Sequence, residues 1–527
     1  TGHIVMTGKS RYFGQDPASG LLYHTVDFSA LTIPADGYVL QAAGKSSAPF
    51  SVRRNLYGRL KTDALLYFTH SLAGAPIKAE FARQAQPPLT RPAGHKNRPT
   101  RCFSGRDLRG TQWPGCDYTL TPKGGWYDAG DYGRYITSTG FSVWAMLNTY
   151  ERQQNGPASE RYAFSDGKLP IAEHFNGTSD LLDIARVGIE FMLSMQIPQG
   201  KRAFVPRGPQ LPIGPLSLQL TDVGGLVHHK VHGKTFPPLP KRPHEDTQPQ
   251  YLYPPSTAAS LHLAAIGAQC ARIWKDIDPE FSDTCLTAAI RAYQAATVFS
   301  DIYAHDVFDG GGGYTDDNVK DEFFWASTEL FLTTKDESYY PKMITYRSGV
   351  GESLHRRDTH TEYVEYLGLM SILAQYDHRT PEADLPDYVH EARNGITAVS
   401  QAFLEQARTS AFSLPYDDPK YYWGSNANLL GRAMVLAYGY NINKNPEFKA
   451  GIIHITDYLL GRNPLKTSYI SGYGQTSMKS PHHRFWAHTL DPNFPAPPPG
   501  VLSGGPNNVN FSDPVAATLR GKCTGQT

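Results

Sequence analysis

TAASLHLAAIGAQCARIW, residues 257 to 274, repeats apolar side chains at intervals of three and four. This spacing is typical of one buried face of an α-helix. Nine further stretches after Ser51 show the same spacing: Leu56–Leu72, Thr137–Arg152, Ser179–Met195, Ser282–Phe299, Asp321–Leu332, Thr361–Gln375, Tyr388–Ala407, Asn426–Tyr440 and Glu447–Leu460. About ten helices with hardly a strand predict a mainly α fold.

The first 50 residues have a different character. Leu21–Phe28 and Gly37–Ala42 are short extended runs separated by the turn-forming Pro34-Ala-Asp-Gly. Two or three strands cannot close a sheet alone. We therefore expect either pairing with other segments or part of a small β domain.

Composition excludes several classes of partner. The 50 basic residues nearly balance the 49 acidic ones, and no basic run stands out to attract nucleic acid or an anionic membrane. No apolar run reaches the roughly 18 residues that would span a bilayer, and Thr1–Met6 lacks the features of a signal peptide. Five cysteines in 527 residues do not make a disulfide framework, which favours the cytoplasm over the periplasm or secretion.

Three long loops carry Gly, Pro and aromatic residues: Gln86–Lys123, Gly200–Ser256 and Asn463–Asn510. Loops of this length in a compact protein are usually functional or disordered, and these contain too many aromatics for disorder. We expect them to form the walls of a cleft.

The segment Gly124-Gly-Trp-Tyr-Asp-Ala-Gly-Asp-Tyr-Gly-Arg134 contains the strongest candidates for chemistry. Asp128 and Asp131 are three residues apart with small residues between them, so both carboxylates can point at one water. Trp126 offers an aromatic face for stacking on a sugar. The alternative is that both aspartates cap a helix N-terminus, and spacing alone favours that alternative.

Residues 125–131 resemble the aspartate motif of family 9 glycoside hydrolases, the inverting cellulase family. The resemblance implies that Asp131 is the general base and that Asp128 helps to bind the nucleophilic water. Ser468–Arg484 resembles the second signature of the family, which implies that His482 and Arg484 bind substrate. Tyr473 in the same stretch offers a stacking face, whereas Thr476 departs from the Asn or basic residue that most members carry.

Four other stretches look like landmarks of the family: Gly310–Leu330, Trp423–Asn426, Asp457–Pro464 and Gly500–Asn507. The resemblance implies an (α/α)6 barrel of six helical hairpins over residues 51–527. It further implies that residues 1–50 are part of an immunoglobulin-like β-sandwich module.

The general acid of the family is a glutamate in a third signature near the C-terminus. The chain contains no glutamate after Glu447, and Lys522–Thr527 resembles the approach to that signature. We expect the acid to lie beyond Thr527. The alternative is a non-catalytic carbohydrate-binding protein on the same barrel.

Metal and cysteine predictions also follow from the resemblance. Asp321 and Glu322 match positions where family members bind a structural calcium, although a solvated helix start explains them equally well. No cofactor is expected for catalysis. Cys102 and Cys116 fall where some relatives hold zinc, so a lost zinc site, a disulfide and two free thiols stay open. Cys270 and Cys285 lie on neighbouring predicted helices as core residues.

The expected substrates share a β-1,4-linked gluco skeleton. Cello-oligosaccharides and chitosan oligosaccharides cleaved by an exo-β-D-glucosaminidase fit the sequence about equally, and the expected partner is the oligosaccharide alone. The implied chemistry is hydrolysis with inversion of the anomeric carbon.

Overall fold

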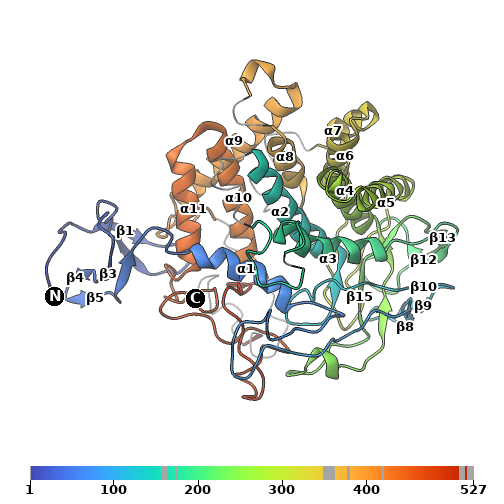
Figure 1. The fold of residues 1–527 in the computed structure, drawn as a ribbon, viewed down its shortest axis with the longest axis horizontal. Coiled ribbons are helices and arrows are strands. Elements are labelled where there is room, and N and C mark those ends of the chain that lie inside the picture. The colour runs from blue at the N-terminus through green and yellow to red at the C-terminus, as the bar shows by residue number, and fades with distance from the viewer. Residues whose placement is uncertain are drawn as a thin grey trace. The chain divides into compact units, whose positions relative to one another are not determined.

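The computed structural model describes residues 2–155, 164–173, 175–347, 363–376, 380–416, 421–509 and 517–518. Helices dominate this part of the chain, as the periodicity predicted (Figure 1). Their bounds are Gly58–His70 (α1), Ile136–Asn155 (α2), Asp180–Ser194 (α3), Thr257–Trp274 (α4), Pro279–Val298 (α5), Lys320–Thr334 (α6), Tyr340–Tyr346 (α7), Glu365–Ala374 (α8), Asp387–Ala407 (α9), Ser425–Asn443 (α10) and Pro446–Leu459 (α11). No helix in the described ranges is long and apolar enough to cross a membrane.

Ten of these helices correspond to the ten predicted stretches, and α4 has the predicted bounds. Its N-terminus is fixed by Ser256, whose hydroxyl accepts a hydrogen bond from Ala259 N at 3.1 Å. Two residues of the predicted stretch Thr361–Gln375 lie outside the described residues. The short helix α7 was not predicted, because seven residues hold too few turns to show a period.

The chain divides into two compact units. Unit 1 contains residues 1–67, 397–479 and 497–527, and unit 2 contains residues 68–396 and 480–496. The predicted boundary at residue 50 does not coincide with either division, so the immunoglobulin-like module stays a prediction.

In unit 1, the N-terminal strands form two-stranded antiparallel ladders. Their bounds are Arg11–Gln15 (β1), Leu22–Thr25 (β2), Ala35–Tyr38 (β3), Gln41–Ala42 (β4), Lys45–Ser46 (β5) and Phe50–Val52 (β6), paired as β1 with β2, β3 with β6, and β4 with β5. The fully buried Asp16 joins this segment to the helical part of the unit, because its Oδ1 accepts from Ala411 N at 3.0 Å. The ring of Tyr23 packs edge-on against Phe412, with centroids 4.9 Å apart.

In unit 2, α4 is the central helix and packs against α2, α5 and α6. Almost all of its residues are buried, which explains why small and apolar side chains occupy every face. A disulfide between Cys270 of α4 and Cys285 of α5 ties two of these helices together. The two cysteines were predicted only as core residues, and they are indeed fully buried.

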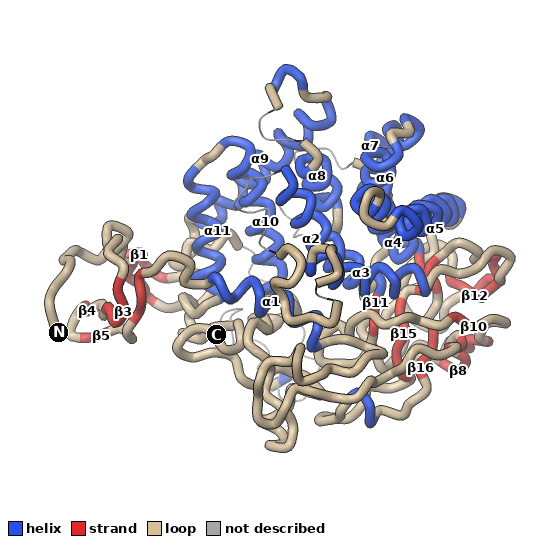
Figure 2. The backbone as a smooth tube through the Cα atoms, in the orientation of Figure 1, coloured by secondary structure: helices blue, strands red, loops and turns tan. Residues whose placement is uncertain are grey.

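Short strands fill the long loops of unit 2, where hardly a strand was predicted. Their bounds are Thr100–Arg101 (β7), Ser104–Arg106 (β8), Gln112–Pro114 (β9), Thr119–Leu120 (β10), Arg134–Tyr135 (β11), Arg202–Pro206 (β12), Leu218–Asp222 (β13), Val227–His228 (β14), Lys230–Gly233 (β15), Gln250–Leu252 (β16) and Pro255–Ser256 (β17). They gather on one side of α4 and α5 (Figure 2). One antiparallel sheet has the order β11-β15-β16 and carries residues of the candidate site.

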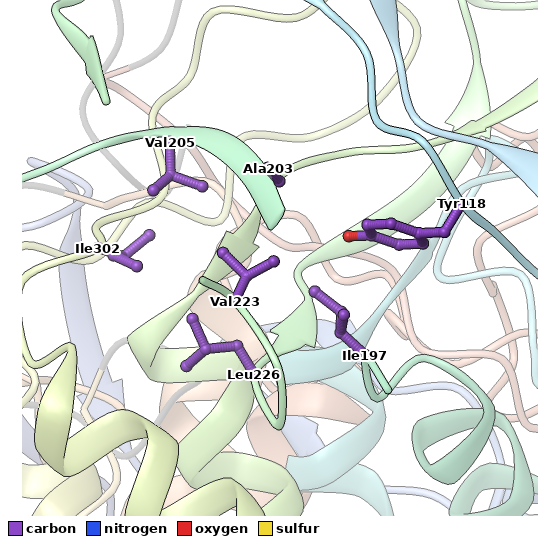
Figure 3. Packing of buried hydrophobic residues seen from close by; sticks show 7 residues of the cluster. All are labelled: Tyr118, Ile197, Ala203, Val205, Val223, Leu226 and Ile302. Atoms are coloured by element: carbon purple, nitrogen blue, oxygen red, sulfur yellow. The ribbon is translucent and has the colours of Figure 1, made fainter. Parts of the chain in front are cut away.

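A small hydrophobic core supports these strands. Tyr118, Ile197, Ala203, Val205, Val223, Leu226 and Ile302 point toward one another (Figure 3). Cys102 and Cys116 pack against this core and are joined by a disulfide, which selects one of the three predicted alternatives. The two disulfides remove the cysteine count as an argument for a reducing compartment.

Candidate active site

Asp128 and Asp131 lie in an irregular loop that precedes β11 and α2. Because α2 begins only at Ile136, neither aspartate occupies its capping position. The loop closes on itself through a hydrogen bond of 3.1 Å from Asp128 N to Gly133 O. Both side chains are partly exposed. The capping alternative is therefore wrong, because neither aspartate caps α2.

One oxygen of the Asp131 carboxyl accepts two hydrogen bonds from the protein. Its Oδ2 accepts from Gly133 N at 3.0 Å and from the hydroxyl of Tyr135 at 2.9 Å. Within the described part of the chain, Oδ1 receives no hydrogen bond. One oxygen is thus fixed by the protein, and the other is available to a water or substrate.

The carboxyl of Asp128 accepts a hydrogen bond at Oδ2 from the hydroxyl of Tyr314. Burial and the neighbouring charge of Asp131 raise the pKa of Asp128 to about 6. Burial and the nearby Asp128 also raise the pKa of Tyr314 well above its ordinary value, so this phenol stays protonated and donates. Asp128, whose pKa is about 6, is therefore paired with the fixed hydroxyl donor of Tyr314.

A run of four glycines, Gly310–Gly313, brings Tyr314 to this place. A Cβ on Gly310 would lie 2.6 Å from Gly233 O, and a Cβ on Gly311 would lie 2.7 Å from the Tyr135 hydroxyl. Such contacts are too short for any side chain, and Gly310 also has a φ of +84°. Glycine is required here because the backbone passes directly over β11 and β15.

The segment around His482 and Arg484 packs against the aspartate loop. A Cβ on Gly130 would lie 1.7 Å from His482 O, so only glycine permits this contact. Arg484 N and Nη1 both donate to Gly130 O, at 3.0 and 2.9 Å, and Nε donates to Pro237 O at 2.9 Å. His482 is exposed beside the loop. The structure thus brings both predicted signatures together.

These contacts alter the interpretation of Arg484. Its side chain is buried, and at least two N–H groups of its guanidinium donate to backbone carbonyls. Its position therefore fits an anchor of the aspartate loop, in addition to the predicted binding of substrate. The adjacent His483 is also buried, and its Nδ1 accepts from Trp486 N at 2.8 Å while its ring stacks on Trp486 at 4.0 Å.

A second polar layer supports the loop. Tyr127, next to Asp128, is bonded through its hydroxyl to His95 Nδ1 at 2.8 Å, and His95 Nε2 lies 3.2 Å from Asp246 Oδ2. The hydroxyl of Tyr132 donates to Lys241 O. The tyrosines that flank the two aspartates are therefore fixed by buried partners and do not face substrate.

Two predicted binding residues have other partners. Trp126 is only 5% exposed, packs against Phe68 with ring centroids 4.8 Å apart, and lines a separate cavity of about 260 Å³. The Trp126 ring is thus part of the core, which argues against the predicted stacking on substrate. Tyr473 belongs to unit 1, where its hydroxyl donates to Asp63 Oδ2 at 2.7 Å.

Sequence reasoning missed three residues that contact the site. Tyr135 and Tyr314 donate to the two aspartates, and Lys230 donates through Nζ to Gly312 O at 2.5 Å. Burial lowers the pKa of Lys230 to about 8. The glycine run was the available signal, since consecutive glycines indicate a close backbone approach.

Asp321 and Glu322 open α6, where Glu322 is fully buried and Asp321 Oδ2 accepts from Val364 N at 2.8 Å. Burial and the charges of Asp321 and Asp316 raise the pKa of Glu322 well above its ordinary value. A buried carboxyl beside two others suits a hard cation. Across the described ranges, however, no three His, Cys, Asp or Glu side chains converge as metal ligands, and calcium stays a prediction.

Known proteins are similar to this chain in sequence and in fold. The profile of glycosyl hydrolase family 9 matches residues 57–519. A cellulose 1,4-beta-cellobiosidase of Acetivibrio thermocellus is 35% identical over 97% of this chain and 58% of its own, and endoglucanase C of Cellulomonas fimi is 36% identical over 96% and 44%. The chain spans about half the length of these curated relatives. A solved Bacteroides ovatus family 9 structure has a TM-score of 0.79 and 28% identity, covering 96% of this chain and 86% of its own. The chain has the aspartate loop in contact with the second signature, and the family profile matches most of its length. This chain is therefore a member of glycosyl hydrolase family 9.

Proposed function

We propose that this chain is the catalytic part of an inverting glycoside hydrolase that cleaves β-1,4 linkages of gluco-configured oligosaccharides. The observation that carries the proposal is the pair Asp128 and Asp131, whose carboxyls share a loop while one oxygen of Asp131 has no donor among the described residues. A general base in an inverting enzyme needs such an oxygen to take a proton from water.

In the proposed reaction, Asp131 Oδ1 accepts a proton from a water that Asp128 helps to orient. The oxygen of that water attacks the anomeric carbon as the bond to the leaving oxygen breaks. The leaving oxygen takes its proton from a general acid, which the family resemblance implies to be a glutamate of the third signature. The anomeric configuration inverts because water and leaving group occupy opposite faces of the sugar.

The finer assignments are part of the same proposal. The helices form an (α/α)6 barrel, with residues 1–50 belonging to an immunoglobulin-like module, and a structural calcium binds near Asp321 and Glu322. Cello-oligosaccharides are favoured over glucosamine oligosaccharides, because the two curated relatives above are named as a cellobiosidase and an endoglucanase. His482 is the exposed donor to sugar hydroxyls.

The alternative from another class is a carbohydrate-binding protein that lacks the acid. Residues 448–527 contain no glutamate. Both candidates bind the same sugar, and only one of them turns it over.

The deciding experiment offers the protein with its natural C-terminus to cellotetraose, chitotetraose and the tetramer of glucosamine. Proton NMR follows the anomer of the first product. The proposal predicts that α-anomeric product appears from a β-1,4-linked substrate. Release of the β anomer would refute inversion, and binding without turnover of any tetramer would establish the non-catalytic alternative.

A further inference from the structure

A chain of hydrogen bonds leads from a buried lysine to the predicted base. Lys230 Nζ donates to Gly312 O at 2.5 Å, Gly312 N donates to the Tyr135 hydroxyl at 2.8 Å, and that hydroxyl donates to Asp131 Oδ2 at 2.9 Å. Lys230 is 2% exposed, so its ammonium does not reach solvent or an incoming sugar.

Strand pairing sets both ends of this chain. In the register of β11 and β15, Tyr135 lies opposite Lys230, and the ammonium is 6.0 Å from the centroid of the tyrosine ring. The backbone of Gly311 then passes so close to the Tyr135 hydroxyl that a Cβ there would lie 2.7 Å from it. The peptide of Gly312 thus uses its carbonyl for Lys230 and its amide for Tyr135.

The amide of Gly312 determines where the phenolic proton points. A tyrosine hydroxyl has one proton, and its oxygen here already accepts from Gly312 N, which leaves the proton for Asp131 Oδ2. Burial and the two nearby aspartates raise the pKa of Tyr135 well above its ordinary value, so the proton stays on the phenol. With Gly133 N on the same oxygen, the lone pairs of Oδ2 are occupied.

We propose that Tyr135 and Lys230 are positioning residues of the general base, which occupy Asp131 Oδ2 and so make Oδ1 the atom that takes the proton from water. Lys230 acts through the Gly312 peptide, and Tyr135 acts on the carboxylate directly. The inference rests on the proposed hydrolysis, because it concerns the base of that reaction.

The same five-residue segment serves the other carboxyl. Gly310–Tyr314 carries the amide that orients Tyr135 and the phenol that donates to Asp128. Lys230 therefore fixes a segment on which both aspartates depend. The titratable groups that interact electrostatically with Asp131 are Asp128, Tyr135, Lys230, Tyr314 and Arg484.

The first test is Tyr135→Phe, which keeps the ring and removes the donor. We expect kcat to fall about tenfold to a hundredfold with KM nearly unchanged, as for loss of a hydrogen bond to a charged group. The acidic limb of the pH profile of kcat should move to higher pH, because a lost donor favours the protonated carboxyl. Tyr118→Phe is the matched control, since that buried hydroxyl bonds His228 at 2.9 Å and touches no aspartate.

The second test is a double-mutant cycle with Lys230→Met. We expect Lys230→Met alone to lower kcat about threefold to tenfold, and to add little when Tyr135 is already Phe, since both act through one chain of bonds. Gly311→Ala is an independent variant that removes no donor but crowds the Tyr135 hydroxyl and the His232 ring. It should reproduce the lowered kcat and the shifted acidic limb.

The outcomes separate the two proposals. A wild-type protein that hydrolyses none of the tetramers overturns the proposed function itself. An active wild type whose Tyr135→Phe variant behaves like Tyr118→Phe, or whose pH limb does not move, overturns the positioning role alone. Fully additive losses in the cycle would show that Lys230 does not act through Tyr135.

Discussion

Two clusters of unit 2 each bring a pair of carboxyls together, and they are built in opposite ways. In the first, Arg272 lies between Glu151 and Glu329, with Nε 2.6 Å from Glu151 Oε1 and Nη2 2.7 Å from Glu329 Oε2. In the second, Asp131 accepts from the Tyr135 hydroxyl and the Gly133 amide, and Asp128 accepts from the Tyr314 hydroxyl.

Further hydrogen bonds surround the guanidinium cluster. Glu151 also accepts from Gln269 at 3.0 Å and Gln375 at 2.7 Å, and these contacts join helices α2, α4 and α8. The two glutamates raise the pKa of Arg272 against the effect of its burial, so the cation persists at every ordinary pH. No oxygen of this cluster is offered to solvent, and its role is to join helices.

The aspartate cluster is left incomplete. Burial and the charge of Asp131 raise the pKa of Asp128 to about 6, and no hydrogen bond reaches Asp131 Oδ1 from the described residues. The difference teaches that a charged partner commits a carboxyl to structure, whereas a neutral donor orients it and leaves it reactive. Four substitutions test this contrast.

The largest expected effect is on catalysis. Asp131→Ala removes the base, and kcat should fall by about 10²–10⁴-fold while the affinity for an unhydrolysed oligosaccharide is largely kept. Asp117→Ala, at an exposed aspartate of the same unit, is the control and should keep full activity. Turnover retained in Asp131→Ala would refute the base role.

The next effect is on stability. Arg272→Leu leaves two buried glutamates without their cation and should lower the free energy of unfolding by about 3–5 kcal/mol. Arg408→Leu breaks an exposed pair with Glu405 and should cost less than about 1 kcal/mol. Chemical denaturation measures both, and equal losses would erase the contrast between the clusters.

A smaller effect concerns the donor to Asp128. Tyr314→Phe should lower kcat about tenfold and move the acidic limb of activity upward, because loss of the hydrogen bond raises the pKa of Asp128 further. Tyr293→Phe loses a buried hydrogen bond of 2.8 Å to Ser327 and serves as the control. A pH profile identical to wild type would show that the Tyr314 hydroxyl does not act on Asp128.

The smallest effect is a gain of stability. The pKa of Asp128 is raised in the folded protein to about 6 from an ordinary 3.8, so folding favours its protonated form and wild type loses stability as pH rises through this interval. Asp128→Asn should therefore be about 1–2 kcal/mol more stable at pH 7.5, less than the full two-unit shift because the side chain is partly exposed.

The gain should vanish near pH 4, where the wild-type carboxyl is protonated. Thermal unfolding at the two pH values measures it. Asp276→Asn makes the same chemical change at an exposed position and should show no pH-dependent difference. A gain of equal size at pH 4 would contradict the linkage.

Much of this molecule was predictable from local pattern. Helical periodicity located ten of the helices, because each buries one face against its neighbours. Family resemblance identified the aspartate loop and the His482–Arg484 segment, which the structure brings together at Gly130. Whether Asp128 and Asp131 act as the family implies stays a prediction for the variants above.

The rest depended on contacts between distant segments. Lys230 lies in the short strand β15, which shows no helical period. Its partner is a glycine carbonyl 82 residues away. Trp126 is adjacent to the aspartate motif in sequence, yet its side chain points into the core. Neither the direction of a loop side chain nor the partner of a buried ammonium is encoded in local spacing.

The contact at Gly130 has a consequence for the order of assembly. Arg484 reaches Gly130 O across 354 residues of chain, and residues 480–496 return to a unit whose other residues end at Ile396. A nascent chain can therefore build most of unit 2 long before the strap that clamps its aspartate loop has been synthesised. Closing so long a loop comes late and slowly, so the clamp on the aspartate loop forms only after the scaffold of unit 2 is in place.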